Sequence, residues 1–297
     1  MKKLLAGIVL LMLIGTFAVF AGGRRDGGDG AGSVVGFSVS TLNNPFFVTL
    51  VDGARAKATE LGLQLVVLDA GDDASKQASD MEDLISRRVS VIIVNPVDSD
   101  AITPSARAAI NANIRVIAVD RLVNGVDVSA SIASDNVAGA RMATEYLVQL
   151  VGQGAEVAEL QGVLGASATV DRGEGFHQVA RSNLNVVASQ TANFNRAAGL
   201  TVTENILQGN PNIRGIFAHN DEMALGAIEA VGNRNIVIVG FDATDDALVA
   251  VRAGRMAATV AQQPDLMGSV AVETAQRLIS GQSVQQSIPV NVSLVTQ

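Results

Sequence analysis

Short apolar runs alternate with amphipathic stretches from residue 34 to the C-terminus. Apolar runs of this length are typical of buried strands, and the stretches between them repeat apolar residues at helical spacing. A strand-helix-strand rhythm predicts parallel, twisted sheets covered by helices on both faces. We predict strands over residues 34–39, 63–69, 91–94, 115–119, 156–161, 186–190, 215–218, 236–241 and 256–262, and helices over residues 50–61, 75–87, 99–111, 137–151, 173–183, 197–208, 221–231 and 266–279.

Two doubly wound lobes accommodate these nine strands and a further C-terminal run over residues 289–295 better than one sheet does. The first lobe is expected to close near residues 131–135, where an Asp/Asn cap starts the next helix. Pro264 interrupts the chain after the strand at 256–262, and a final crossing near Asn291 makes three connections, which form a hinge. We therefore predict an α/β fold with two doubly wound parallel-sheet lobes joined by a three-strand hinge. The predicted lobes comprise residues 34–134 plus 263–291, and residues 135–262 plus 292–297.

The N-terminal segment has the pattern of an export signal. Lys2 and Lys3 precede an apolar run that ends in small residues at Ala21 and Gly22, as in a cleaved secretory signal. The alternative is an uncleaved membrane anchor, because the run is close to the minimum spanning length. We predict a signal peptide over residues 1–21, a flexible glycine-rich tail over residues 22–33, and a periplasmic or otherwise extracytoplasmic location.

Composition narrows the function further. Hydrophobic residues make up 48% of the chain and charged residues 17%, as in a globular protein. The net charge of −8, without a basic block, argues against a nucleic-acid partner and against anionic membrane surfaces. Cysteine is absent, so the chain has no disulfide and no thiolate nucleophile.

The first strand is followed by turn residues and then by two aromatic rings. Asn43, Asn44 and Pro45 favour a tight turn and a helix start, and Phe46 and Phe47 come next. In a parallel α/β sheet this is the carboxyl edge, where such folds bind their ligands. Two core phenylalanines beside turn-forming amides are the alternative interpretation.

The ends of the other strands carry Asn, Asp, Arg and Gln with a few Phe residues, but no catalytic histidine pair and no serine elbow. Planar amide, carboxylate and guanidinium groups can each engage two neighbouring hydroxyls of a sugar. The C–H faces of a sugar stack on aromatic rings, a role that Phe46 and Phe194 could share from opposite lobes. For Asp120 and Arg121 the alternative is a strand-end salt bridge, and for Asp242 a helix cap.

Several motifs carry a resemblance to a known family. Ser-Thr-Leu-Asn-Asn-Pro-Phe-Phe, Val-Asp-Arg, Ile-Ala-Ser-Asp-Asn, Arg-Gly-Glu-Gly-Phe, Asn-Asp-Glu-Met-Ala and Val-Gly-Phe-Asp occur in order between residues 34 and 295. In these segments the chain resembles the periplasmic sugar-binding proteins of ABC importers, and most of all their ribose-binding members. The resemblance implies a type I periplasmic binding protein fold, no enzymatic activity, no cofactor and no metal. It also implies sugar contacts by Asn44, Phe46, Phe47, Asp120, Arg121, Arg172, Phe194, Asn220, Asp242 and Gln262.

Two departures from the family pattern concern the site. His219 stands where glutamine is common, and Ala243 replaces a frequent glycine. The implied partners are a monosaccharide, with D-ribose first, and the membrane subunits of an ABC permease. A chemoreceptor is a further possible partner, and we expect a monomer.

Three other functions stay open at this stage. Receptors for allose, xylose or galactose share the architecture, and discrimination among them turns on one or two hydroxyls. A sugar-sensing repressor would need an N-terminal helix-turn-helix and a basic face. A glycosidase would need paired carboxylates such as Asp171 with Glu174, or Asp242 with Asp245, but Glu174 and Asp245 fit helix starts.

Overall fold

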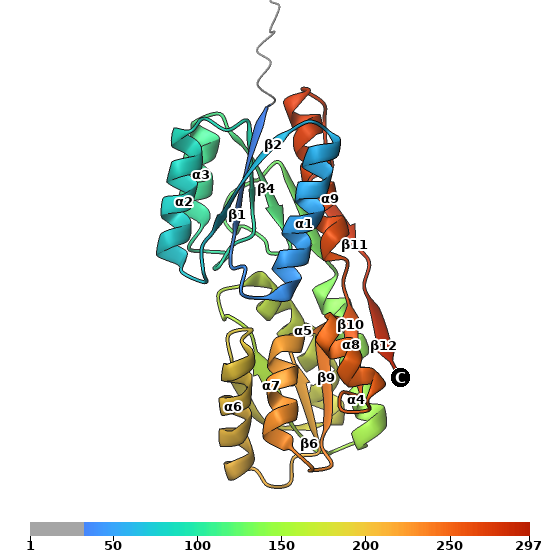
Figure 1. Cartoon of the computed structure of the whole chain (residues 1–297). Helices are drawn as coiled ribbons and strands as arrows, with labels where there is room; N and C mark the ends of the chain where they lie inside the picture. The colour runs from blue at the N-terminus through green and yellow to red at the C-terminus, as the bar shows by residue number, and fades with distance from the viewer. Residues whose placement is uncertain (1–32) are drawn as a thin grey trace, which may run out of the picture. The chain divides into compact units, whose positions relative to one another are not determined.

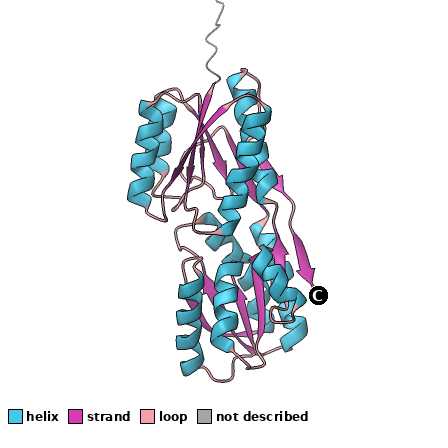
Figure 2. Cartoon of the chain, in the orientation of Figure 1, coloured by secondary structure: helices cyan, strands magenta, loops and turns pink. Residues whose placement is uncertain are grey.

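The computed structural model describes residues 33–297, in which strands and helices alternate (Figure 2). The predicted signal peptide (residues 1–21) and nearly all of the predicted tail (residues 22–33) lie outside the described residues. The described strands form two separate six-stranded sheets. Helices lie on both sides of each sheet, as the buried apolar strands require.

The first sheet has the strand order β11-β5-β4-β3-β1-β2, and all its pairs are parallel. Helices α1 and α9 cover one face and α2 and α3 the other (Figure 1). The strands are β1 (Val34–Val39), β2 (Gln64–Asp69), β3 (Val91–Val94), β4 (Arg115–Val119), β5 (Ala130–Ser134) and β11 (Ser287–Val290), and the helices are α1 (Pro45–Glu60), α2 (Ala74–Ser86), α3 (Thr103–Asn111) and α9 (Pro264–Ile279).

The second sheet repeats this plan with the order β12-β10-β9-β8-β6-β7. Helices α4 and α5 pack on one face, and α6, α7 and α8 on the other. The strands are β6 (Glu156–Gln161), β7 (Asn185–Thr191), β8 (Gly215–Ala218), β9 (Val237–Asp242), β10 (Ala258–Ala261) and β12 (Ser293–Thr296), and the helices are α4 (Asn136–Val151), α5 (Ser167–Asn183), α6 (Arg196–Gly209), α7 (Asp221–Val231) and α8 (Asp245–Arg252).

The chain passes between the two sheets three times, after β5, after β10 and after β11. The prediction of two doubly wound lobes joined by a three-strand hinge is therefore confirmed. The expectation of purely parallel sheets is wrong for one pair, because β12 runs antiparallel to β10. The short connection from β11 to β12 carries the chain onward into the second sheet, so the edge strand enters in the opposite direction.

Element boundaries differ from the prediction at several points. Helix α1 starts at Pro45, with Asn44 as its cap. Helix α5 starts at Ser167 and not at residue 173, since its small and polar first turn hides the helical apolar spacing. Strand β5 and helix α8 were not predicted, because β5 alternates small and polar residues and α8 is short. Glu174 lies within α5 and not at a helix start.

Candidate ligand-binding site

One narrow cavity lies where strand ends of the two lobes face each other. Nine of the ten predicted site residues line it, together with Ala168, which was not predicted. Gln262 does not line this cavity, but its amide nitrogen donates to the Asp242 carboxylate at 2.7 Å. The lining residues are Asn44, Phe46, Phe47, Asp120, Arg121, Ala168, Arg172, Phe194, Asn220 and Asp242.

The start of α1 forms one wall. Asn44 caps the helix, and its Oδ1 accepts from the Phe46 N–H at 2.9 Å, which leaves its amide nitrogen for other partners. Phe46 and Phe47 pack edge to face with ring centroids 5.2 Å apart. Both rings are nearly buried and also belong to the core of the first lobe. The two rings are therefore core residues and part of the cavity wall at the same time.

Asp120 and Arg121 follow β4 and are both almost completely buried. Asp120 has a φ of 63°, a conformation that costs an L-residue energy and turns the chain sharply at the strand end. The Asn95 amide donates to the Asp120 carboxylate at 3.2 Å. Burial raises the pKa of Asp120, while Arg121 and then Arg172 oppose that rise.

Arg121 lies between two aromatic rings of opposite lobes. Its guanidinium carbon is 5.1 Å from the Phe47 centroid and 5.2 Å from the Phe194 centroid. It also donates to the Pro96 carbonyl at 2.9 Å. Its Nε lies 3.8 Å from the Asp120 carboxylate and has no hydrogen-bond partner, so the simple salt-bridge interpretation accounts for little of this arrangement. Burial lowers the pKa of Arg121.

Arg172 comes from the second turn of α5, and so it does not directly follow a strand as the sequence suggested. Its Nε donates to the Asn136 side chain at 2.8 Å and its Nη1 to the His219 carbonyl at 2.5 Å. The guanidinium lies 3.9 Å from the centroid of the Phe241 ring and 3.7 Å from the Asp242 carboxylate. Burial lowers its pKa, and Asp242 opposes that shift.

Asp242 ends β9 in a strained turn. Its φ is 129° and that of Ala243 is 57°, values that favour glycine. Asp221 holds this turn from α7, because its carboxylate accepts from the Thr244 N–H at 2.8 Å and from the Thr259 hydroxyl at 2.6 Å. Burial raises the pKa of Asp242 well above its ordinary value and that of Asp221 to about 7.

Phe194 and Asn220 complete the wall on the second lobe. Phe194 has a φ of 57°, and its ring lies over Gly162, where any side chain would collide with it. Asn220 caps α7 by accepting from the Met223 N–H at 3.0 Å, and its amide donates to the Phe194 carbonyl at 3.3 Å. The Asn220 side chain therefore caps a helix and lines the cavity at the same time.

The charges in the cavity balance when all four groups are ionised. Two guanidinium groups, Arg121 and Arg172, face two carboxylates, Asp120 and Asp242. A charged ligand would disturb this balance at a buried site, whereas an uncharged ligand with several hydroxyls would not. The arrangement offers donors and acceptors at close spacing between aromatic rings, which suits a polyol with apolar faces.

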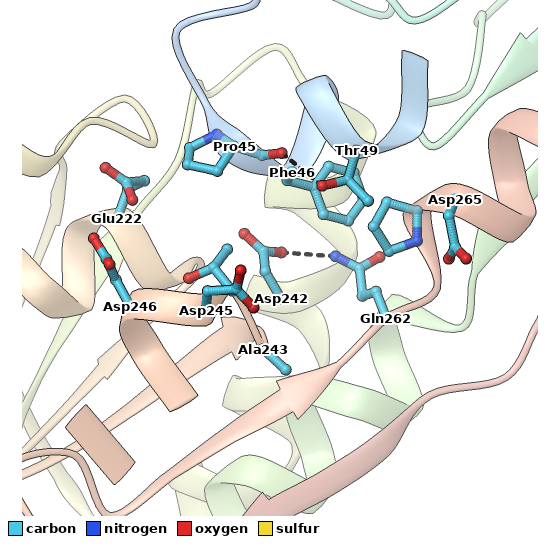
Figure 3. A pocket seen from close by; sticks show the side chains of 12 residues that line it. Pro45, Phe46, Thr49, Glu222, Asp242, Ala243, Asp245, Asp246, Gln262 and Asp265 are labelled. Atoms are coloured by element: carbon cyan, nitrogen blue, oxygen red, sulfur yellow. Dashed lines mark hydrogen bonds between the residues drawn. The ribbon is translucent and has the colours of Figure 1, made fainter. Parts of the chain in front are cut away.

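A larger hollow of about 330 Å³ adjoins the cavity and shares Phe46 and Asp242 with it. Figure 3 shows Thr49 and Phe46 on one side of this hollow and Asp242 and Ala243 on the other. Asp245, Asp246 and Asp265 also line it and make it acidic. Within residues 33–297, no group of three or more His, Asp or Glu side chains is placed to hold a metal ion.

Sequence reasoning missed two residues that contact Arg172, Asn136 and Phe241, and one further residue that lines the cavity, Ala168. Asn136 was interpreted as part of a helix cap, but Asp135 is the cap of α4, and the Asn136 side chain holds the guanidinium. Phe241 lies under Arg172, and Ala168 lines the cavity one turn before it. A polar residue directly after a cap was the available signal for Asn136.

Comparison with known proteins gives one consistent result. Residues 35–283 match the family model described as the periplasmic binding protein domain. The ribose import binding protein RbsB of Bacillus subtilis is 47% identical over 265 residues, which cover 89% of this chain and 87% of that protein. RbsB of Escherichia coli is 46% identical over 271 residues, covering 90% and 92%. The crystal structure of a Bacillus halodurans ABC transporter solute binding protein with bound myo-inositol has a TM-score of 0.85 at 32% identity, covering 91% of this chain and 96% of that one.

Proposed function

Because the chain belongs to the periplasmic binding protein family, we propose that it captures D-ribose between its two lobes and delivers it to an ABC permease. The observation that carries the proposal is the balanced set of two arginines and two aspartates between aromatic rings of both lobes. Binding proteins for transport, and not enzymes, are the relatives with this architecture. The ten predicted site residues are the proposed sugar contacts.

The narrowness of the cavity supports a cycle of opening and closing. Its volume is only about 10 Å³, because Arg121 lies between the Phe47 and Phe194 rings. A sugar ring is far larger than this, so it cannot enter while the lobes are together. We propose that the lobes separate about the three crossings, near Ser134, Gln262 and Asn291, and close again over the sugar. Contacts from both lobes then favour the closed form.

Ribose is favoured over other sugars by the names of the relatives. Proteins named as ribose import binding proteins are 45–47% identical to this chain over most of its length. Receptors for allose, xylose or galactose are the alternative, since the family also includes proteins crystallised with other polyols, such as myo-inositol. Discrimination among these ligands depends on one or two hydroxyl contacts.

The family places the protein outside the cytoplasm. Export by a signal peptide over residues 1–21 is part of this proposal, as is a tail over residues 22–33. No helix in the described part of the chain has the length and apolar character needed to cross a bilayer. We propose that residues 34–134 plus 263–291 and residues 135–262 plus 292–297 move as two lobes. A monomeric state and docking to a chemoreceptor complete the proposal.

A thermal-shift screen followed by calorimetry tests the sugar. D-ribose is expected to raise the unfolding temperature most among D-ribose, D-allose, D-xylose, D-galactose and myo-inositol, since a ligand of the native state stabilises it by mass action. Asp120→Ala is expected to remove nearly all ribose binding while the protein stays folded. Arg181→Ala, an exposed change on α5, is the control and is expected to bind normally. A larger shift with another sugar would overturn ribose, and near-native binding by Asp120→Ala would overturn the site.

A further inference from the structure

The two lobes also touch each other directly, next to the cavity. The backbone N–H of Ser99, between β3 and α3, donates to the Gly165 carbonyl at 2.8 Å. The Ser99 Oγ accepts from the Ser167 N–H at 3.1 Å. The Ser167 Oγ in turn accepts from the N–H of Leu122, which follows β4, at 2.9 Å. Three hydrogen bonds therefore join the first lobe to the entrance of α5 in the second, none of them through a cavity-lining side chain.

Helix α5 lacks a cap from its own lobe. Its cap residue is Ala166, which has no side-chain acceptor for the free N–H groups of the first turn. Ser99, which is completely buried, supplies an acceptor from the opposite lobe. The same helix carries Ala168 and Arg172 of the cavity. When the lobes close, the first lobe thus supplies the missing cap to the helix that carries Arg172.

The approach of the lobes at this point requires a glycine. A Cβ on Gly165 would lie 1.7 Å from Oδ2 of Asp98 in the first lobe. Asp98 is held in place because its Oδ1 accepts from the N–H groups of Asp100 and Ala101 at 2.9 and 2.8 Å. The φ of Gly165 is not in the left-handed region, so its own backbone does not demand glycine. Glycine is needed here because Asp98 of the opposite lobe occupies the place of a side chain.

We propose that Ser99, Gly165 and Ser167 form a latch that sets how much of the protein is closed and thereby sets the apparent affinity for the ligand. The sugar is held by a closed form in which the cavity is wider but these contacts, which involve no cavity-lining side chain, are kept, so apparent affinity falls in proportion to the closed fraction. These three residues are positioning residues, because they act through the lobe arrangement and through α5. The effect on sugar affinity rests on the proposed function, whereas the effect on the lobe equilibrium does not.

Two substitutions weaken the latch to different degrees. Ser99→Ala removes the acceptor for the Ser167 N–H and is expected to weaken D-ribose binding about 3- to 10-fold in calorimetry. Gly165→Ala forces a side chain against Asp98 and is expected to weaken binding about 10- to 100-fold. Gly209→Ala is the matched control, since a Cβ there meets nothing within 4 Å, and it is expected to bind as the unmodified protein does.

A second change separates the latch from local damage in the second lobe. Asp98→Ala removes both atoms that a Cβ at residue 165 would meet most closely, Oδ2 at 1.7 Å and Cγ at 2.4 Å, and Asp98→Ala alone is its control. Added to Gly165→Ala, it is expected to recover at least half of the lost binding free energy. Failure of this rescue would mean that Gly165→Ala disturbs its own lobe, and the steric part of the latch would be wrong.

The lobe equilibrium is also measured without sugar. Because the chain has no cysteine, spin labels can be placed by Ala108→Cys on α3 and Gln178→Cys on α5, both at exposed positions. Pulsed electron resonance then gives the distribution of distances between the lobes. Ser99→Ala and Gly165→Ala are expected to move ligand-free protein toward longer distances. Unchanged distances and unchanged affinity in both variants would overturn the latch. Altered distances in a protein that does not bind ribose would support the latch and overturn the proposed ligand.

Discussion

Replacing Arg172 with alanine probes the site most directly. The side chain donates to Asn136 and to the His219 carbonyl, lies over the Phe241 ring and approaches the Asp242 carboxylate to 3.7 Å. Arg172→Ala removes all four interactions. It also leaves Asp242 buried without its neighbouring cation, which drives the pKa of that carboxyl further up.

Arg172→Ala is expected to change two quantities that can be measured separately, the folding stability and the affinity for the sugar. Breaking a buried ion pair by removing one partner costs about 3–5 kcal/mol of folding stability. Hydrogen bonds to a charged group contribute about 1.5–3 kcal/mol each. If Arg172 makes two such bonds to the sugar, their loss weakens binding by about 10²- to 10⁴-fold. The loss of sugar affinity is thus expected to be far larger than the loss that a substitution at an ordinary surface position causes.

Calorimetry with D-ribose and urea unfolding without sugar measure the two effects. In Arg172→Ala combined with Asp242→Asn, the unpaired charge is gone, so part of the stability is expected to return while binding stays lost. Arg181→Ala on the same helix is the control and is expected to match the unmodified protein in both assays. A folded Arg172→Ala protein that binds ribose within about 5-fold of normal, well below the range expected above, would refute the assignment.

Three further predictions concern the surroundings of the site. Ala243→Gly is expected to raise the free energy of unfolding by about 1 kcal/mol, because Ala243 has a φ of 57° that glycine adopts without strain; urea unfolding measures it. Burial raises the pKa of Asp221 from an ordinary 3.8 to about 7, so the unfolded chain loses this proton first. Its contribution to stability is then complete below pH 4 and is lost as the pH rises through 7, and Asp221→Asn is expected to reduce that slope in urea unfolding at pH 5 and pH 8. His219→Gln is expected to keep ribose affinity within about 3-fold by calorimetry, because Arg172 bonds to the backbone carbonyl and glutamine can still donate to Glu159.

Each of these has a contradicting result. A lower urea midpoint for Ala243→Gly would mean that the methyl group packs usefully in the turn. An equal slope with pH in Asp221→Asn and in the unmodified protein would show that this carboxyl does not titrate in the folded state between pH 4 and 7. A large loss of affinity in His219→Gln would place the imidazole, and not the carbonyl, in control of Arg172.

Much of the fold and most of the site residues could be predicted from local patterns. Buried strands in parallel sheets are short apolar runs, and ligand groups follow directly after such runs, so Asn44, Asp120 and Asp242 stood out in the sequence. Arg172 was also interpreted as following a strand, but it lies within a helix whose small and polar first turn hides the helical pattern. Ala243 was noted as a departure, but only its positive φ explains why glycine suits that position.

The sequence by itself determined the rhythm of strands and helices, the two lobes and the chemical character of a neutral, polar and partly aromatic site. These properties depend on residues close together in the chain, where periodicity and turn chemistry act. Only the tertiary structure decided which partners those residues have: Asn136 on Arg172, Asp221 on the turn at Thr244, and Ser99 on the uncapped start of α5. Such contacts join residues far apart in the chain, and a buried polar group takes whichever partner the packed lobes bring within hydrogen-bonding distance.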